Sequence, residues 1–421
     1  MYKLSYRVQR HSSRFLLKFL KGFSRPEKKW IRDIYRGMLK SGDVKLSEIS
    51  RSIQGDVRLI ENRLSLNLME REISSKIYDS YLPWVRDLIQ EDTLISVDLS
   101  DVRKEYAREM EYLDKVWDGS EGEVHEGYWF LGIIAHNEDK EKIVPLYQEL
   151  YSQKAPDFES ENTVILNSIE KVKKGIGNKG IVVIDRGGDR RILFKKLHSE
   201  EGSGRSTFLI RMNPDKRHLE VSGRRLYPQQ VFRRYKYSVE LKKKKDEKEV
   251  TRRLRYNWIR VGIPGVEGEF TLIGVKGLGK NPLYLITNAC VENKNDVFFL
   301  IKGYLSRWTI EESFRWEKQA YNLEDIRVRD YISLRNMVTI LLLVFAFLTV
   351  RLQWSPRLKL LFKMIYKTSQ RLRNDIHFLL YALSRGVSDL FGSLIPTIWT
   401  LDPPSKPLKY LTLFDLPEKK S

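Results

Sequence analysis

Four polar residues are spaced so that they share one stripe of a predicted helix: Tyr304, Arg307, Glu311 and Lys318. At about 100° and about 1.5 Å per residue, they fall within an arc of about 60° along about 21 Å of helix axis. One carboxylate flanked by a phenol and two cations is typical of a metal ligand in a row of phosphate contacts. A solvated helix face with ordinary ion pairs gives the same pattern, so both interpretations stand at this point.

Two aspartates, Asp98 and Asp185, come directly after short apolar runs that are typical of buried strands. A carboxylate at the end of such a strand faces the crevice where α/β proteins bind their ligands. Each could instead cap the turn or helix that follows. We favour capping for Asp101 and Asp189, which lie further from their strands, and a functional role for Asp98 and Asp185. Asp101 remains a rival for the first position.

Three carboxylates, with Glu311 as the third, favour a hard cation such as Mg²⁺ or Mn²⁺. Two such ions can activate a water or sugar hydroxyl and stabilise the leaving oxygen of a phosphodiester. The single cysteine, Cys290, excludes an internal disulfide and a multi-cysteine zinc site, and the six histidines show no zinc-type spacing. Neither a phosphate-loop motif nor a Gly-x-Ser-x-Gly motif occurs, so ATP and a serine hydrolase are not indicated.

The net charge of +20 is concentrated in two blocks. Residues 1–70 hold 16 Lys/Arg and 7 Asp/Glu, and residues 211–260 hold 17 and 6. Together these surpluses equal the whole excess, which predicts two surfaces that contact a polyanion. The chain has the composition of a soluble protein, and we expect it in the reducing cytoplasm with no membrane partner. The apolar run 338–350 is shorter than a membrane span and predicts a buried helix.

The elements that must position these residues form an α/β pattern. Apolar runs predict strands, helical periodicity predicts the segments between them, and alternation with turn signals predicts a β-rich insertion. Two short helices around Gly55 resemble a helix-turn-helix, although generic helical packing gives the same pattern. The predicted regions are a helical DNA-binding domain (1–70), a linking helix (71–92), a catalytic core (93–212 and 291–330), a basic β-rich insertion (213–290) and a helical C-terminal region (331–421).

The spacing Tyr304-x2-Arg307-x3-Glu311-x6-Lys318 resembles the YREK signature of the DDE transposases of the insertion sequence 4 family. The segment Asp185-Arg-Gly-Gly-Asp189 is similar to the sequence around that family's second catalytic acid. This resemblance covers roughly residues 90–330. It implies a ribonuclease H-like fold with a β-strand insertion, and Mg²⁺-dependent cut-and-paste transposition by a dimer that brings the two element ends together.

The resemblance also implies a role for each matching residue. Asp98, Asp185 and Glu311 would bind two Mg²⁺ ions, which Mn²⁺ could replace, and Tyr304, Arg307 and Lys318 would contact phosphates of double-stranded DNA. Tyr284 lies near the place where relatives use an aromatic residue, more often tryptophan, to hold a flipped base; it could equally be an ordinary strand residue. Arg186 is a further candidate phosphate contact, or a partner of Glu311 or Asp98. The DNA would be the terminal inverted repeats and the target.

Two other functions fit the same residues. A metal-dependent nuclease on this fold would cut without joining strands. A DNA-binding protein descended from a transposase would keep the fold and not cut.

Overall fold

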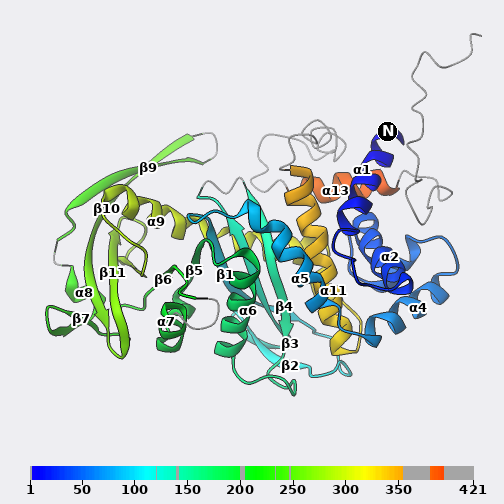
Figure 1. The fold of residues 1–421 in the computed structure, drawn as a ribbon, viewed down its shortest axis with the longest axis horizontal. Helices are drawn as coiled ribbons and strands as arrows, with labels where there is room; N and C mark the ends of the chain where they lie inside the picture. The colour runs from blue at the N-terminus through cyan, green and yellow to red at the C-terminus, as the bar shows by residue number, and fades with distance from the viewer. Residues whose placement is uncertain are drawn as a thin grey trace, which may run out of the picture.

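A large mixed sheet with helices on both faces dominates the structure, a computed structural model that describes residues 2–119, 121–138, 142–199, 204–232, 234–245, 248–353 and 380–392 (Figure 1). Within these residues the sheet has 12 strands in the order β2-β3-β1-β5-β6-β12-β11-β10-β7-β8, with β4 paired to β3 and β9 to β10. The mixed α/β class predicted from the sequence is confirmed at this level.

The acid-bearing strands lie in the first half of this sheet. β1 (Leu94–Arg103) pairs antiparallel with β3 (Glu123–His136) and parallel with β5 (Ile181–Ile184). β6 (Phe208–Arg211) continues the parallel run, and β4 (Ile143–Tyr151) lies on the other side of β3. The short hairpin strand β2 (Asp114–Asp118) was not predicted.

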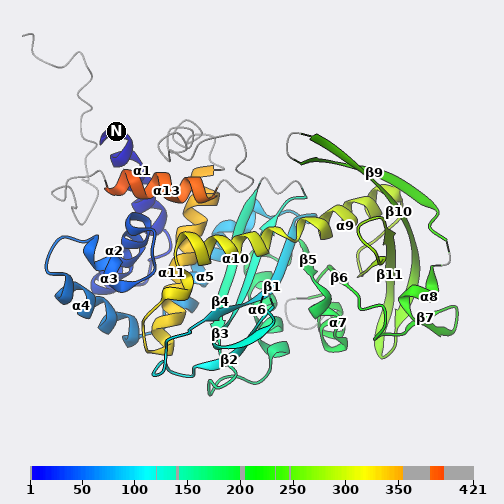
Figure 2. The ribbon, with the colours of Figure 1, turned by 180° about the vertical axis from the view of Figure 1, so that it is seen from behind.

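Helices cover both faces of this part of the sheet. α5 (Ser74–Val85), α6 (Glu161–Ile176) and α7 (Arg191–His198) lie on the face seen in Figure 1. α9 (Lys294–Ser306) and α10 (Thr309–Ala320) run along the opposite face, seen in Figure 2. Two apolar cores follow from strand alternation: Ile95, Val97 and Ile184 belong to one, while Leu94, Ile181 and Val183 pack in the other together with residues of α9.

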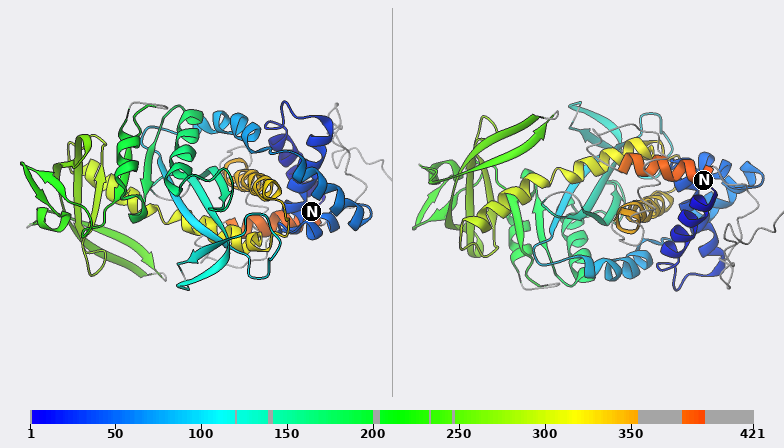
Figure 3. Two further views of the ribbon diagram at one scale, coloured as in Figure 1. Left: turned by 90° about the horizontal axis from the view of Figure 1, so that it is seen from below. Right: turned by 90° about the horizontal axis from the view of Figure 1, so that it is seen from above.

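The insertion is not a separate sheet, because its last strand joins the core sheet. β12 (Leu283–Thr287) pairs with β6, and outward from it lie β11 (Val266–Lys276) and β10 (Lys248–Ile263). The remaining elements are β7 (Leu219–Val221), β8 (Arg224–Leu226), α8 (Pro228–Val231) and β9 (Tyr237–Lys245). Figure 3 shows the insertion at one end of the molecule and the N-terminal helices at the other.

The N-terminal helices are α1 (Tyr2–Leu16), α2 (Arg25–Ser41), α3 (Leu46–Arg51) and α4 (Val57–Glu70). Ser24 and Glu27 form a capping box at the start of α2, and Gly42 ends it in the left-handed conformation at φ 66°. α2 packs against both α11 (Tyr331–Ala346) and α13 (Leu380–Gly392), so the N- and C-terminal regions form one helical layer.

α11 continues into a π-helical segment, η4 (Phe347–Gln353). The stretch Tyr331–Leu352 is long and apolar enough to cross a membrane, but 89% of its most apolar window is buried inside the protein. It packs as a core helix, as the apolar run predicted, although the helix is longer than that run. The parts 354–379 and 393–421 of the predicted C-terminal region lie outside the described residues.

Candidate active site

Asp98 and Asp185 are neighbours because β1 and β5 run parallel in register. The prediction that Asp98 ends its strand is wrong, because β1 continues to Arg103 and Asp98 pairs with Gly132 of β3 inside it. Asp101 lies further along the same strand and not in a following turn, so the capping role favoured for it is also wrong. Leu94 pairs with Ile181, and the last paired positions are Val97 and Ile184. Asp98 and Asp185 each follow the last residue that pairs between β1 and β5, and adjacent strands lie about 4.8 Å apart. Since alternate residues share a face, Asp98 lies on the face of Leu94, and Asp185 on the face of Val183, both toward α9 and α10.

Two glycines let the helices of this face approach the sheet. A Cβ on Gly303 of α9 would lie 2.8 Å from the Leu94 Cδ2, and a Cβ on Gly132 of β3 would lie 2.4 Å from the Phe314 Cε1. Gly132 pairs directly with Asp98 across β3 and β1. The close contact of α10 with the sheet therefore occurs beside Asp98, one helical turn from Glu311.

Arg307 joins the first aspartate to the glutamate. Its Nη1 donates to Asp98 Oδ2 at 2.6 Å and its Nη2 donates to Glu311 Oε1. Arg307 stands where α9 ends and α10 begins, with helical dihedral angles, so the single predicted helix is two helices joined at this residue. The arginine that the spacing assigned to phosphate contacts therefore points toward the acids in this structure.

Burial raises the pKa of Asp98 to about 6; Arg307 opposes that shift, and the negative charges of Asp185 and Glu311 add to it. Burial works against the charge of Arg307, but Asp98, Tyr304 and Glu311 together raise its pKa above the ordinary value. The pKa of Asp98 rises despite the ion pair because burial, the largest cause, outweighs the charge of Arg307. The three acids and Arg307 together carry net negative charge, which additional positive charge would stabilise.

Tyr304 and Lys318 lie on either side of this group. Tyr304 is buried in the core beneath α9, close enough to Arg307 to affect its charge. Lys318 Nζ lies 3.3 Å from Asp101 Oδ1 and 3.1 Å from Glu324 Oε1. Asp101 is thus held by the lysine, whereas Asp98 contacts Arg307 and shares its surroundings with Asp185 and Glu311.

The turn after β5 places the remaining residues of the second motif. Asp185 Oδ1 accepts from the Gly187 amide at 2.7 Å, and Arg186 is exposed on the short 3-10 turn η2 (Arg186–Gly188). Asp189 accepts from the Asn213 amide at 2.8 Å and from the Arg217 guanidinium. Asp189 therefore anchors the start of the insertion and does not cap α7, contrary to the role favoured for it. Asp185 follows β5 directly and also caps η2, which is the alternative left open for it. It is Arg307, not Arg186, that pairs with Asp98 and Glu311.

Tyr284 is buried in β12 and is 4% exposed. Its ring stacks on Phe232 at 6.4 Å between centroids, and it also contacts Tyr235. A flipped base could reach this ring only after those neighbours moved, so the structure places Tyr284 as an interior strand residue.

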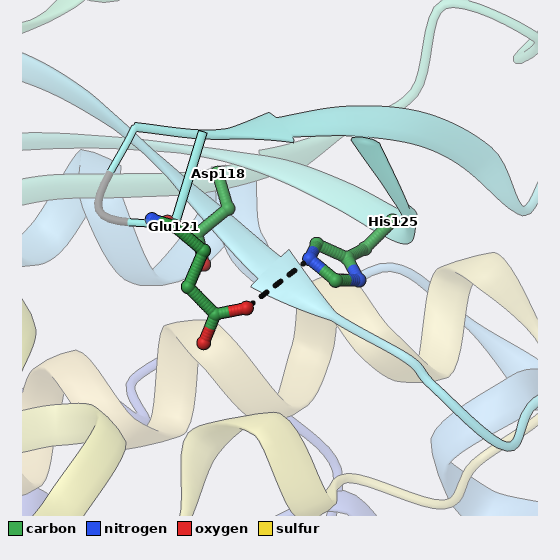
Figure 4. A group of neighbouring side chains, drawn as sticks. All are labelled: Asp118, Glu121 and His125. Carbon is green, nitrogen blue, oxygen red and sulfur yellow. Dashed lines mark hydrogen bonds and ion pairs between the residues drawn. The ribbon is translucent and has the colours of Figure 1, made fainter. Parts of the chain in front are cut away.

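A second group of potential metal ligands, Asp118, Glu121 and His125, lies on the β2–β3 hairpin (Figure 4). Their ligand atoms lie within 4.8 Å of one another, the one such group of three in the described part of the chain. However, Arg103 Nη2 lies 2.7 Å from Asp118 Oδ2 and 2.6 Å from Glu121 Oε1. Because a guanidinium already compensates both acids, we assign this group a structural role.

Gly132, which admits α10 to the sheet, and Glu317, which is buried on α10, are not among the predicted site residues. The sequence holds a signal for Gly132, because an isolated glycine inside a strand often marks a close approach by another element. Glu317, buried on α10, accepts from the Gln148 side chain, and burial raises its pKa to about 8. Its position among the charged residues of α10 gave no signal that it faces inward.

Among the comparisons with known proteins, one family match covers more than half of the chain. No curated protein matches the chain. Among solved structures, a piggyBac transposase synaptic complex with hairpin DNA, determined by cryo-EM, aligns over 91% of this chain and 75% of its own, with 10% identity and a TM-score of 0.44. The transposase DDE domain family matches residues 90–347, which include Asp98, Asp185 and Glu311. The chain therefore belongs to the transposase DDE domain family.

Proposed function

We propose that this protein is a DNA transposase of the insertion sequence 4 family, with a ribonuclease H-like core. It would excise an insertion sequence at its terminal inverted repeats and join it to target DNA. The observation that carries the proposal is that Asp98 and Asp185 lie on adjacent parallel strands while Arg307 bridges Asp98 to Glu311. The ligand atoms of the three acids do not all lie within 4.8 Å of one another in this structure, so shared cations would draw them closer together. The family match over residues 90–347 supports the same activity.

The donor set fits Mg²⁺ or Mn²⁺. Asp98, Asp185 and Glu311 offer only carboxylate oxygens, the ligands that these cations prefer. Burial is the main cause of the raised pKa of Asp98, and the charges of Asp185 and Glu311 add to it; a divalent cation would compensate those charges. Two bound ions would supply an activated water or sugar hydroxyl and stabilise the leaving oxygen. The three carboxylates would hold these ions.

The remaining residues would position the DNA. Arg307 pairs with Asp98 and Glu311 in this structure. Where cations were held by these acids, its guanidinium would be available to bind a phosphate near the cleaved bond. Tyr304 is buried in the core and lies close enough to Arg307 to affect its charge. Lys318, beside Asp101, and Arg186, in the turn after Asp185, would bind neighbouring phosphates.

The proposal includes a homodimer that holds two element ends, and a location in the cytoplasm with the DNA. A nuclease that cuts without joining, or a binding protein that does not cut, remains the alternative. A single assay separates the three: purified protein is incubated with Mg²⁺ and a plasmid that carries the gene with its flanking DNA. Excised element and joined product support transposition. Cleavage without joining indicates a nuclease, and a bound but uncut plasmid indicates a binding protein.

A further inference from the structure

A cavity of about 390 Å³ lies between α2 and the α3–α4 pair, far along the chain from the acids. α2 contributes one stripe, with Lys29, Arg32, Asp33 and Arg36 at helical spacing, and α4 contributes Arg63. Four cationic side chains and one carboxylate line the cavity, which leaves three positive charges in excess. A stripe that faces a neighbouring helix is ordinarily apolar, so this charge requires a reason.

Part of this positive charge is withdrawn from solvent. Arg32 is 8% exposed, and Arg36 donates to Ser13 Oγ at 2.6 Å. Burial, together with the charge of Arg32, lowers the pKa of Arg36 to about 10, and Asp33 offsets this only in part. Asp33 Oδ2 also pairs with Arg63 Nη2 at 2.8 Å. An anion inside the cavity would relieve the repulsion among these cations.

The lining selects for phosphate and offers little to a base. Ser52 and Gln54, from the turn after α3, add polar groups, and Ile53 and Ile60 add apolar surface. Among the described residues that line the cavity, none is aromatic, so a nucleobase would find no stacking partner there. Contacts to phosphate without contacts to bases are typical of backbone binding that positions a duplex.

We propose that this cavity binds a backbone phosphate of double-stranded DNA, held by Lys29, Arg32, Arg36 and Arg63. This inference rests on the proposed function, which supplies the DNA. In this proposal, residues of both α2 and α4 hold one DNA phosphate, which is a specific contact for the first basic block, residues 1–70. Asp33 limits the affinity, because it occupies Arg63 in the absence of DNA.

The test measures binding of full-length protein to a fluorescently labelled duplex cut from the DNA that flanks the gene, over a range of salt concentrations. One bound phosphate contributes about 0.9 to the slope of log K against log salt. Lys29→Gln/Arg63→Gln should weaken binding roughly tenfold at about 0.1 M salt and reduce the slope by about one. The matched control, Lys21→Gln/Arg51→Gln, removes the same charge from exposed positions outside the cavity lining and should leave the slope unchanged.

A second variant should change DNA affinity in the opposite direction. Asp33→Asn removes the acid and releases Arg63, so DNA binding should become several-fold tighter. A purely structural role for the Asp33–Arg63 pair would instead make both Asp33→Asn and the double variant less stable, without strengthening binding. Thermal unfolding of each variant separates these outcomes.

Four results would overturn the proposal. Equal loss of slope in the double variant and its control would assign the effect to general charge. Unchanged DNA binding, with inorganic phosphate or ATP bound in the wild type and lost in the double variant, would make the cavity a small-molecule site. If the wild type fails to bind duplex DNA, both the proposed function and this inference are wrong. If the wild type cleaves the plasmid normally and the cavity variants bind DNA as the wild type does, only this inference is wrong.

Discussion

Replacing Gly132 by alanine tests how α10 positions Glu311. The added Cβ would lie 2.4 Å from Phe314 Cε1 and 2.8 Å from Phe314 Cζ, against an ordinary carbon–carbon contact of about 3.5–4.0 Å. The Phe314 ring must therefore move by about 1 Å. It cannot simply rotate away, because it is 6% exposed and packs on Phe130 at 5.3 Å between ring centroids.

The displacement falls on the helix that carries Glu311, one turn before Phe314. We expect Gly132→Ala to lower stability by about 1–3 kcal/mol, the usual cost of overpacking. A shift of about 1 Å at the acids should lower Mg²⁺-dependent cleavage by up to about 100-fold. The assays are urea unfolding and cleavage of a labelled element end at a temperature where the variant is folded.

Two companions make the result specific. Phe314→Leu removes the clash, so the double variant Gly132→Ala/Phe314→Leu should recover most of the cleavage that Gly132→Ala loses. Gly279→Ala, at a glycine with no atom within 4 Å of the added Cβ, should have no effect on cleavage. Full activity and unchanged stability in Gly132→Ala, or loss without rescue, would refute the reasoning.

The other predictions concern charge. Glu311→Gln should abolish cleavage and leave binding of element ends intact in a gel-shift assay, since its charge serves the cations; persistent cleavage would remove it from the site. Lys318→Ala should reduce the salt slope of end binding by about one, whereas an unchanged slope would mean that the lysine only holds Asp101 and Glu324. Burial raises the pKa of Glu317 from 4.5 to about 8, so its contribution to stability is complete below pH 4.5 and is lost as the pH rises through 8. Because Gln is neutral at every pH, the free energy of unfolding of Glu317→Gln, measured with urea, should exceed that of the wild type by on the order of 3 kcal/mol at pH 8 and match it near pH 5. The same difference in free energy at both pH values would contradict a buried neutral Glu317.

The strands that carry the acids could be located because burial on both faces gives a largely apolar run, interrupted in β1 before Asp98 only by the buried Ser96. The apolar run did not predict that β1 continues through Asp98 to Arg103. Residues 181–184 form β5, the strand expected directly before Asp185. The hairpin strand β2 (Asp114–Asp118) could not be predicted in this way, because it is a short edge strand rich in charged residues. Strand pairing between the core and the insertion depends on contacts distant in sequence, which local patterns do not contain.

The site shows the same division. Spacing placed Tyr304, Arg307 and Glu311 on one side of a helical segment, but helical periodicity does not say whether an arginine faces solvent or a carboxylate. The partner of Arg307, Asp98, is 209 residues away along the chain. The inward orientation of Glu317 likewise depends on the packing of α10 against the sheet, because an isolated glutamate on a charged helix is ordinarily solvated.

The most direct test of the claim that Asp98, Asp185 and Glu311 bind metal is to count the ions that the protein retains when each acid is replaced. Electron paramagnetic resonance titration with Mn²⁺ should find two ions bound to the wild type, and Asp98→Asn, Asp185→Asn and Glu311→Gln should each lose at least one. Glu121→Gln, at the group compensated by Arg103, should retain both. Unchanged Mn²⁺ binding in all three acid variants, or loss only in Glu121→Gln, would contradict the assignment of the site.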